Sequence, residues 1–422
     1  MPNRRNAIYS LLILCLLGGL FTGRAFFFNL AYVLAGLVII SFVWSWLAVR
    51  WISISRRTRT LRTQVGRNIE EAFSVYNRSY LPKLWLEIRD ESDLPGHRAS
   101  HVVPALGPRS SYRWYVQTPA IVRGEFTLGP VTIISGDPFG LFSSPRKIGS
   151  TSRVIVYPQT VPITQIEMPM GVLSGGEAQR RRAQTITTNA AGVREYAPGD
   201  SFNRIHWAST ARRDRLMVKE FEIDPLADVW LFVDFSASSL VDAPTVRRVN
   251  NFGPAIPYNG QIPPSTEEYA IVLAASLAQF FVNAERALGF AAHIPHREIV
   301  QPERGNRQLV RIFQALAVAR STTHHSLAEM LILETPYFTR GTTLVIITAS
   351  LDRAWIAEAQ LLARKGIRPM AVLIDPYSFG ASPALNGVSI TDVRATLRLA
   401  KIPNILVRRG DDLTAALAQR PL

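Results

Sequence analysis

The chain has 422 residues, 47% of them hydrophobic, so it is long enough for several packed cores, and a fibrous or wholly disordered protein is excluded. Its net charge of +15 lies in two blocks: nine basic residues without an acid before residue 70, and nine basic against three acidic residues between positions 180 and 219. The single cysteine, Cys15, excludes an internal disulfide.

Two uncharged apolar runs open the chain, at residues 7–22 and 25–49. The second is long enough to cross the roughly 30 Å hydrocarbon core of a bilayer, and the first is at the short end of the range. A signal peptide is the alternative for the first run, but no small-residue cleavage site follows it. Basic residues flank the outer ends, and only Arg24 lies between the runs. Residues 1–62 therefore predict a hairpin in the inner (plasma) membrane with both termini cytoplasmic.

Residues 63–170 change to short alternating runs that are broken by proline and glycine. Such runs predict the antiparallel strands of a small β-sandwich or barrel. They cover residues 84–89, 112–117, 124–128, 131–135 and 154–157. Residues 137–142 predict a turn with an apolar anchor. His97 and His101 have no evident third ligand nearby, so no metal site is predicted there.

Residues 171–224 form a basic segment that is expected to link two domains. Its sequence LSGGEAQR, at 173–180, is similar to the signature loop of ABC-transporter ATPases. The chain has no GxxxxGK[ST] phosphate loop, so we predict no nucleotide as cofactor. A longer pattern follows, G-x-R-x-Y-x-x-G-D-x-x-x-x-I-H-W and then Ala-Arg. Its key residues are Arg194, Tyr196, Gly199, Asp200, Arg204, His206, Trp207 and Arg212.

This pattern resembles the bacterial family known as domain of unknown function 58. Arg123-Gly124 and the sequence DPFGLF at 137–142 are similar to the family's upstream β region, and two leading transmembrane helices are its usual preface. Members are commonly encoded beside MoxR-type AAA+ ATPases. The resemblance therefore implies such an ATPase as a partner in the assembly or maturation of another complex.

The motif mixes three arginines with Asp200 and two aromatic rings, and arginine binds carboxylates and phosphates in a bidentate way. Two interpretations stay open. The motif is a buried ion-pair network that locks the β domain to the next domain, or it is a docking or catalytic surface. Asp200 and His206 could form a general-base pair, but no nucleophile accompanies them. We therefore predict no catalytic residue.

Residues 225–422 alternate apolar strands with helices. The predicted strands are 229–234, 289–294, 343–348, 369–374 and 404–407, and the predicted helices are 266–288, 306–319, 326–333, 353–364, 391–400 and 412–418. This order predicts a doubly wound, Rossmann-like α/β domain with a mostly parallel sheet. Ligands bind such sheets at the carboxyl ends of the strands.

Asp234, Ser236 and Ser238 follow the first of these strands. Their D-x-S-x-S spacing resembles the metal-ion-dependent adhesion site of von Willebrand factor type A domains, which implies Mg²⁺ (or Mn²⁺) held by oxygen ligands. Thr323, or its neighbour Thr322, would be the loop threonine of such a site. Ala349 stands where the resemblance expects an aspartate, and Asp352 is the nearest acid. The alternative is that Asp234 and the serines only hydrogen-bond their own loop.

An insertion with five prolines occupies residues 239–265, beside the candidate site, and it either carries partner specificity or is disordered. From all these features we predict a non-catalytic, membrane-anchored interaction or adaptor protein that faces the cytoplasm. A rival hypothesis is a metal-dependent hydrolase that uses Asp200, His206 and Asp234, and it requires the three side chains to converge. The basic block does not favour nucleic acid as partner, because it lacks the aromatic spacing of single-strand binders.

Overall fold

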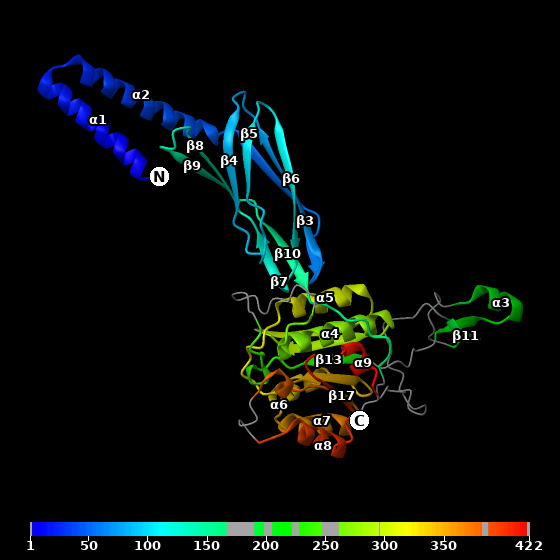
Figure 1. Cartoon of the computed structure of the whole chain (residues 1–422). Helices are drawn as coiled ribbons and strands as arrows, with labels where there is room; N and C mark the ends of the chain where they lie inside the picture. The colour runs from blue at the N-terminus through cyan, green and yellow to red at the C-terminus, as the bar shows by residue number, and fades with distance from the viewer. Residues whose placement is uncertain are drawn as a thin grey trace. The chain divides into compact units, whose positions relative to one another are not determined.

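The computed structural model describes residues 2–166, 190–197, 205–221, 228–246, 261–294, 296–381 and 387–419. It is a mixed α/β structure with two N-terminal apolar helices and several sheets (Figure 1). The chain divides into two compact units. Unit 1 contains residues 1–160, 242–275 and 313–320, and unit 2 contains 161–241, 276–312 and 321–422. The domain boundaries predicted at residues 62, 170 and 224 stay predictions.

The two N-terminal helices are α1 (Pro2–Thr22) and α2 (Ala25–Ala48). The segments Arg4–Thr22 and Ala25–Ala48 are long and apolar enough to span a membrane. A Cβ added at Gly18 would lie 3.2 Å from the Phe27 ring, and one added at Gly19 would lie 3.0 Å from the Phe28 ring. The two glycines therefore let the two helices approach closely. Helix α1 begins five residues before the predicted apolar run, so that it also includes the basic residues Arg4 and Arg5.

Three sheets build the rest of unit 1's N-terminal part. Their strand orders are β1 (Ile52–Thr58), β3 (Asn68–Asn77), β6 (Ser111–Pro119); β5 (His101–Leu106), β4 (Lys83–Asp90), β8 (Val131–Gly136), β9 (Ser143–Ile148); and β2 (Arg62–Gln64), β10 (Ser152–Tyr157), β7 (Gly124–Leu128). All neighbours are antiparallel except β2 and β10. The first two sheets share a core that includes Phe73, Leu86, Val103 and Ile133. Strand β1 falls inside the range predicted as the membrane hairpin.

A buried charged cluster lies beside the first of these sheets. Arg56 contacts Glu71 at 2.6 Å and Asp90 at 2.9 Å, and His97 Nε2 lies 2.8 Å from Asp90. Burial would raise the pKa of Asp90, but hydrogen bonds from His97 and Ser92 and the Arg56 charge hold it below its usual value. The ring of His97 is therefore part of an ion-pair cluster. His101 instead stacks on Tyr112.

Unit 2 contains a six-stranded sheet. Its order is β15 (Arg297–Glu303), β14 (Leu288–His293), β13 (Val229–Val233), β16 (Thr343–Thr348), β17 (Arg368–Ile374) and β18 (Asn404–Val407). Strands β14, β13, β16, β17 and β18 run parallel to one another. Strand β15, at the edge, is antiparallel to β14. The sheet is therefore mostly parallel, as the sequence predicts. Strand β15 is not predicted, because its half-exposed sequence REIVQPE lacks a buried apolar run.

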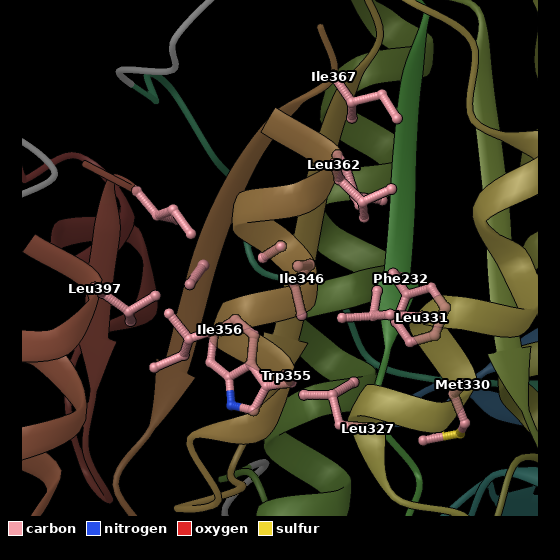
Figure 2. Close-up of a cluster of buried hydrophobic side chains, with 14 of the residues drawn as sticks. Phe232, Leu327, Met330, Leu331, Ile346, Trp355, Ile356, Leu362, Ile367 and Leu397 are labelled. Carbon is pink, nitrogen blue, oxygen red and sulfur yellow. The ribbon is translucent and has the colours of Figure 1, made fainter. Parts of the chain in front are cut away.

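The core of unit 2 lies between this sheet and the helices α6 (Leu327–Glu334), α7 (Ala354–Arg364) and α8 (Ile390–Leu399). Figure 2 shows Phe232 and Ile346 of the sheet facing Leu331 and Trp355 of the helices. A Cβ added at Gly289 would lie 2.6 Å from the Trp230 ring, so a glycine is required for the close approach of β13 and β14. The buried strands have continuous apolar sequences, which explains why most of this sheet could be predicted from the sequence.

The C-terminal half also contains the α-helices α4 (Thr266–Asn283), α5 (Asn306–Val318) and α9 (Leu413–Leu417). Helix α4 ends five residues before the predicted end, and Glu285 then adopts a left-handed backbone with φ of 55°. A residue in this conformation ends a helix.

Candidate functional site

The candidate site lies where the central strands of the six-stranded sheet end. Val233 of β13 pairs with Ala292 of β14 and with Ile347 of β16. The next residue of each strand therefore lies at the same carboxyl edge, which brings together Asp234, His293 and Thr348. In a parallel sheet this edge is where ligands bind.

Asp234 is buried, with 4% of its surface exposed. Its Oδ1 accepts a hydrogen bond from the Ser236 backbone N–H at 2.9 Å, and its Oδ2 accepts one from Thr348 Oγ1 at 2.7 Å. Burial raises the pKa of Asp234 above its ordinary value, against the opposing effect of these hydrogen bonds. Thr348 was not predicted as a site residue, although it is the last residue of a predicted strand.

The predicted hydroxyls gather around the first loop. Ser236 forms a parallel bridge with Thr323, whose carbonyl accepts the Ala237 N–H at 2.8 Å. Ser238 is exposed, and its Oγ lies 3.4 Å from Ser236 Oγ. Ser239, which the D-x-S-x-S pattern does not include, contacts Ser236 Oγ at 3.0 Å. The structure thus brings Asp234, Ser236, Ser238 and the backbone of Thr323 together.

Asp352 serves a different local purpose. Its Oδ1 accepts the Ala354 N–H at 3.0 Å at the start of α7, and its side chain is exposed. Asp352 is connected to the site only through other residues. Its N–H donates a hydrogen bond to Ser350 Oγ, and the Ser350 N–H donates one to Thr348 Oγ1. The hydrogen-bonding partner of Asp234 on this side is Thr348, so a second carboxylate is not supplied there.

The donors at this edge are one carboxylate and several hydroxyls, which are the hard oxygen ligands that Mg²⁺ accepts. In the part of the chain that the structure describes, no group of three or more His, Cys, Asp or Glu residues could hold a metal. Among the described residues of this cluster, Asp234 is the one carboxylate, so the attraction for a cation is weaker than at a site with two carboxylates. The residues present therefore fit a weakly held Mg²⁺ or Mn²⁺, and Asp234 with Ser236 and Ser238 would hold it.

A second polar cluster lies beside the first, at the end of β14. Glu334 is fully buried, its Oε1 lies 2.8 Å from His293 Nε2, and both its oxygens accept hydrogen bonds from Arg297, at 2.7 and 2.9 Å. Burial would raise the pKa of Glu334, but Arg297 and His293 hold it below its usual value. The ring of His325 lies 6.3 Å from that of His293. The sequence signal for this cluster was a single acid at the end of an apolar helix, which sequence reasoning missed.

The family motif forms a small separate element. Strand β11 (Ala190–Glu195) pairs with β12 (Met217–Phe221), and α3 (Trp207–Arg213) lies between them in the sequence. The strands place Arg194 opposite Val218, and the Tyr196 N–H donates to the Leu216 carbonyl. Gly199, Asp200 and Arg204 lie outside the described residues.

His206 caps α3, because its Nδ1 accepts the Ser209 N–H at 3.1 Å. Trp207 is 68% exposed, Arg212 is exposed, and α3 buries none of its residues. Helix α3 is therefore exposed. The interpretation of the motif as a buried ion-pair network stays a prediction, because Asp200 and Arg204 lie outside the described residues. The hydrolase hypothesis stays untested, since Asp200 is not described.

A buried ion-pair network instead surrounds Arg123, within unit 1. Its guanidinium contacts Glu267 at 2.9 Å and Glu268 at 2.8 Å, both in the first turn of α4. Its Nη1 also donates to the carbonyls of three residues at the end of α5, namely Leu316, Ala317 and Ala319. This arginine belongs to the Arg-Gly pair on which the family resemblance partly rests. The burial and contacts of Arg123 indicate that the pair has a structural role.

The motif overlaps a match to a described family model. Residues 192–252 match the model described as "Protein of unknown function DUF58". The chain is 25% identical over 211 residues to the "Uncharacterized protein YeaD" of Bacillus subtilis (strain 168), which covers 47% of this chain and 52% of that protein. The chain thus spans about half the length of this curated relative.

Solved structures show only faint likeness. The CARDB domain of the PF1109 protein from Pyrococcus furiosus is 14% identical, over 25% of this chain and 91% of that domain, with a TM-score of 0.20. The alkylpurine DNA glycosylase AlkC of Pseudomonas fluorescens is also 14% identical, over 30% of this chain and 38% of that protein, with a TM-score of 0.18. Scores this low carry no argument about fold or function.

Proposed function

We propose that this chain, for which the matches at residues 192–252 and to YeaD support the DUF58 family, is a membrane-anchored adaptor that binds a partner protein. Helices α1 and α2 hold it in the inner membrane, and both termini face the cytoplasm. The unit 2 sheet acts as a doubly wound, von Willebrand factor type A-like domain. The carboxyl edge around Asp234 is its binding surface.

The anchoring part of the proposal is supported by two helices that could span a membrane. Their basic residues support the orientation, because Arg4 and Arg5 lie in the first turn of α1 and Arg50 follows α2. Only Arg24 lies in the connection between them. A bias of this kind favours the cytoplasm for both outer ends.

The binding part rests on one observation, the cluster in which the buried Asp234 meets Thr348 and Ser236, with the exposed Ser238 at its rim. A carboxylate without a cationic partner in its hydrogen bonds, at the carboxyl edge of a parallel sheet, is suited to an incoming ligand. When bound, Mg²⁺ would join this cluster to a carboxylate of the partner. Asp234 would carry the charge, and the hydroxyls would orient the contact.

The partner that we propose is a MoxR-type AAA+ ATPase, with which the chain would act in the assembly or maturation of another complex. The family resemblance supports this choice. The proposal needs neither a catalytic residue nor a nucleotide in this chain. Helix α3 would add a second contact, because its Trp207 and Arg212 are exposed.

Affinity capture from membranes tests the proposal. The tagged full chain should recover the ATPase in Mg²⁺, and Asp234→Ala should lose most of it, because a charged hydrogen-bonding group at a binding site contributes about 2 kcal/mol or more, roughly 30-fold in affinity. Asp228→Ala is the matched control, since Asp228 precedes the same strand at its opposite end. Equal recovery by the two variants, or no ATPase with the unmutated chain, contradicts the proposal.

A further inference from the structure

The turn between β8 and β9 contacts the membrane helix α2. The ring of Phe142 lies edge-on to that of Phe42, with centroids 5.6 Å apart, and Ser144 Oγ lies 2.9 Å from Ser45 Oγ. The guanidinium of Arg5, from α1, lies 6.0 Å from the Phe142 ring. All these residues belong to unit 1. Figure 1 shows β8 and β9 beside the end of α2.

These contacts place the turn at a definite depth. Phe42 is six residues before Ala48, the last residue of α2, and a helix rises about 1.5 Å per residue, so the contact lies about 9 Å inside the end of the helix. Interfacial segments bury their apolar side about 5–10 Å into the boundary between headgroups and acyl chains. A turn that reaches Phe42 therefore reaches this boundary if the end of α2 marks the surface of the bilayer.

The turn is apolar at its tip and internally rigid. Asp137 is buried, and its carboxylate accepts the N–H groups of Phe139 at 3.0 Å and of Phe142 at 2.6 Å. Phe139 itself is 53% exposed. An aromatic side chain that is held outward by a fixed turn is costly in water and favourable at a membrane interface.

Two tryptophans extend the exposed aromatic surface at the same end of the domain. Trp85 is 66% exposed, and the Ser135 hydroxyl, two residues before Asp137, donates to its carbonyl at 3.2 Å. Trp51 is 49% exposed and lies three residues after Ala48, the last residue of α2. Both have a left-handed backbone, with φ of 52° and 58°. This conformation is uncommon for bulky residues and points to a functional constraint.

Basic side chains surround the same end of α2. Lys83 Nζ donates to the Leu47 carbonyl at 2.6 Å, and Arg146 Nη1 donates to the Val49 carbonyl at 3.1 Å. The guanidinium of Arg50 lies 3.8 Å from the centre of the Trp46 ring. Cations here complement the partial negative charge of the helix end and the anionic headgroups of a cytoplasmic leaflet.

From these observations we propose that Phe139, Trp85 and Trp51 form a membrane collar, which seats the β sheets of unit 1 on the lipid interface around α2. The inference rests on the membrane insertion proposed above and goes beyond it, because it assigns lipid contact to the β strands as well as to the helices. The occupant of the collar is the headgroup region of an anionic bilayer. Rigid seating would fix the soluble part at one height above the membrane.

Site-specific fluorescence on the full chain tests the collar. Cys15→Ser removes the native thiol, and Phe139→Cys then carries an environment-sensitive dye in nanodiscs that hold one chain in anionic lipid. Tyr115→Cys is the control, because Tyr115 is an exposed aromatic residue, 75% accessible, on β6. Tyr115 pairs with Ala72 of β3, and Ala72 is five residues from Asn77, which lies at the end of β3 near α2. At 3.3 Å per residue, Ala72 and Tyr115 are therefore about 17 Å along the strands from that end. Ile39→Cys, on α2, reports insertion itself.

The collar predicts that the dye at position 139 is quenched by nitroxide-labelled lipid and protected from iodide, whereas the dye at position 115 behaves in the opposite way. Quenching by lipid at position 39 but only by iodide at position 139 would overturn the collar and leave the anchor intact. Protection from iodide without quenching by lipid would assign position 139 to a protein contact and would also overturn it. A dye at position 39 that remains in water would remove the anchor and the collar together.

Discussion

At the carboxyl edge of the sheet, Asp234 is a carboxyl group whose charged form is penalised by burial. Ser236 and Thr348 donate hydrogen bonds to it, but both are uncharged. Glu334, the neighbouring buried acid, is instead paired with Arg297 and His293. The pKa values of the two acids therefore move in opposite directions, upward for Asp234 and downward for Glu334. Of the two, Asp234 has the greater capacity to gain from an added cation.

The raised pKa of Asp234 gives a sign to the pH dependence of stability. A carboxyl group with a folded pKa above its unfolded value of about 3.8 contributes full stability below that value and loses it as the pH rises through the folded pKa. We expect Asp234→Asn to remove this part of the decline. The melting temperature of the full chain in detergent, measured from acidic to neutral pH, checks it. Asp352→Asn, at an exposed position, is the control and should retain the decline that Asp234 causes.

Metal addition provides a second measurement on the same variants. Because the ligand carboxylate must be ionised, Mg²⁺ should raise the melting temperature more as the pH rises, by mass action on the folded state. This effect should disappear in Asp234→Asn and persist in Asp352→Asn. If Mg²⁺ shifts the melting temperature of the unmutated chain at no pH, then Asp234 and the hydroxyls only hydrogen-bond the first loop and Thr348.

At the scale of elements, Arg123 connects β7 to two helix ends. Its guanidinium satisfies carbonyl groups at the end of α5, which have no partner within the helix, and it neutralises Glu267 and Glu268 at the start of α4. The two acids also suit the positive end of the α4 dipole. One buried side chain thus sets the approach of a strand and two helices within unit 1.

Substitution of Arg123 should be strongly destabilising. Arg123→Met removes the guanidinium that contacts the buried carboxylates of Glu267 and Glu268. Loss of one partner of a buried ion pair costs about 3–5 kcal/mol. Thermal unfolding of the full chain in detergent measures the effect. The triple variant with Glu267→Gln and Glu268→Gln should recover part of the loss, because the uncompensated charge is gone. If the triple variant is less stable than Arg123→Met, then burial of charge is not the cause.

The secondary structure was predictable where burial is complete. The strand at residues 343–348 and the strand at 404–407 have the predicted ends, since continuous apolar runs mark strands that are covered on both faces. Strand β1 was missed, because its sequence ISISRRT carries two arginines and resembles a membrane flank. Its assignment depends on pairing with β3, and Arg56 is neutralised by Glu71 only in the folded chain.

At the scale of the whole molecule, the placement of the units relative to the bilayer depends on the orientation of α1 and α2. In the Cys15→Ser background, a cysteine at Arg24 and one at Asn306 should label from opposite sides of the membrane. Arg24 lies between the two helices, and Asn306 is the first residue of α5. Impermeant maleimide on intact and opened cells measures the accessibility of each. Labelling of both from the same side would refute the predicted topology.

The sequence by itself determined the apolar helices, the alternating strands and helices of the C-terminal half, and the position of Asp234, Ser236 and Ser238 after a buried strand. These features are local, since periodicity and motif spacing operate over a few residues. The tertiary structure decided which residues complete each site. Thr348 is 114 positions from Asp234, and Glu268 is 145 positions from Arg123. Contacts between residues so far apart depend on strand register and helix packing, which no local pattern specifies.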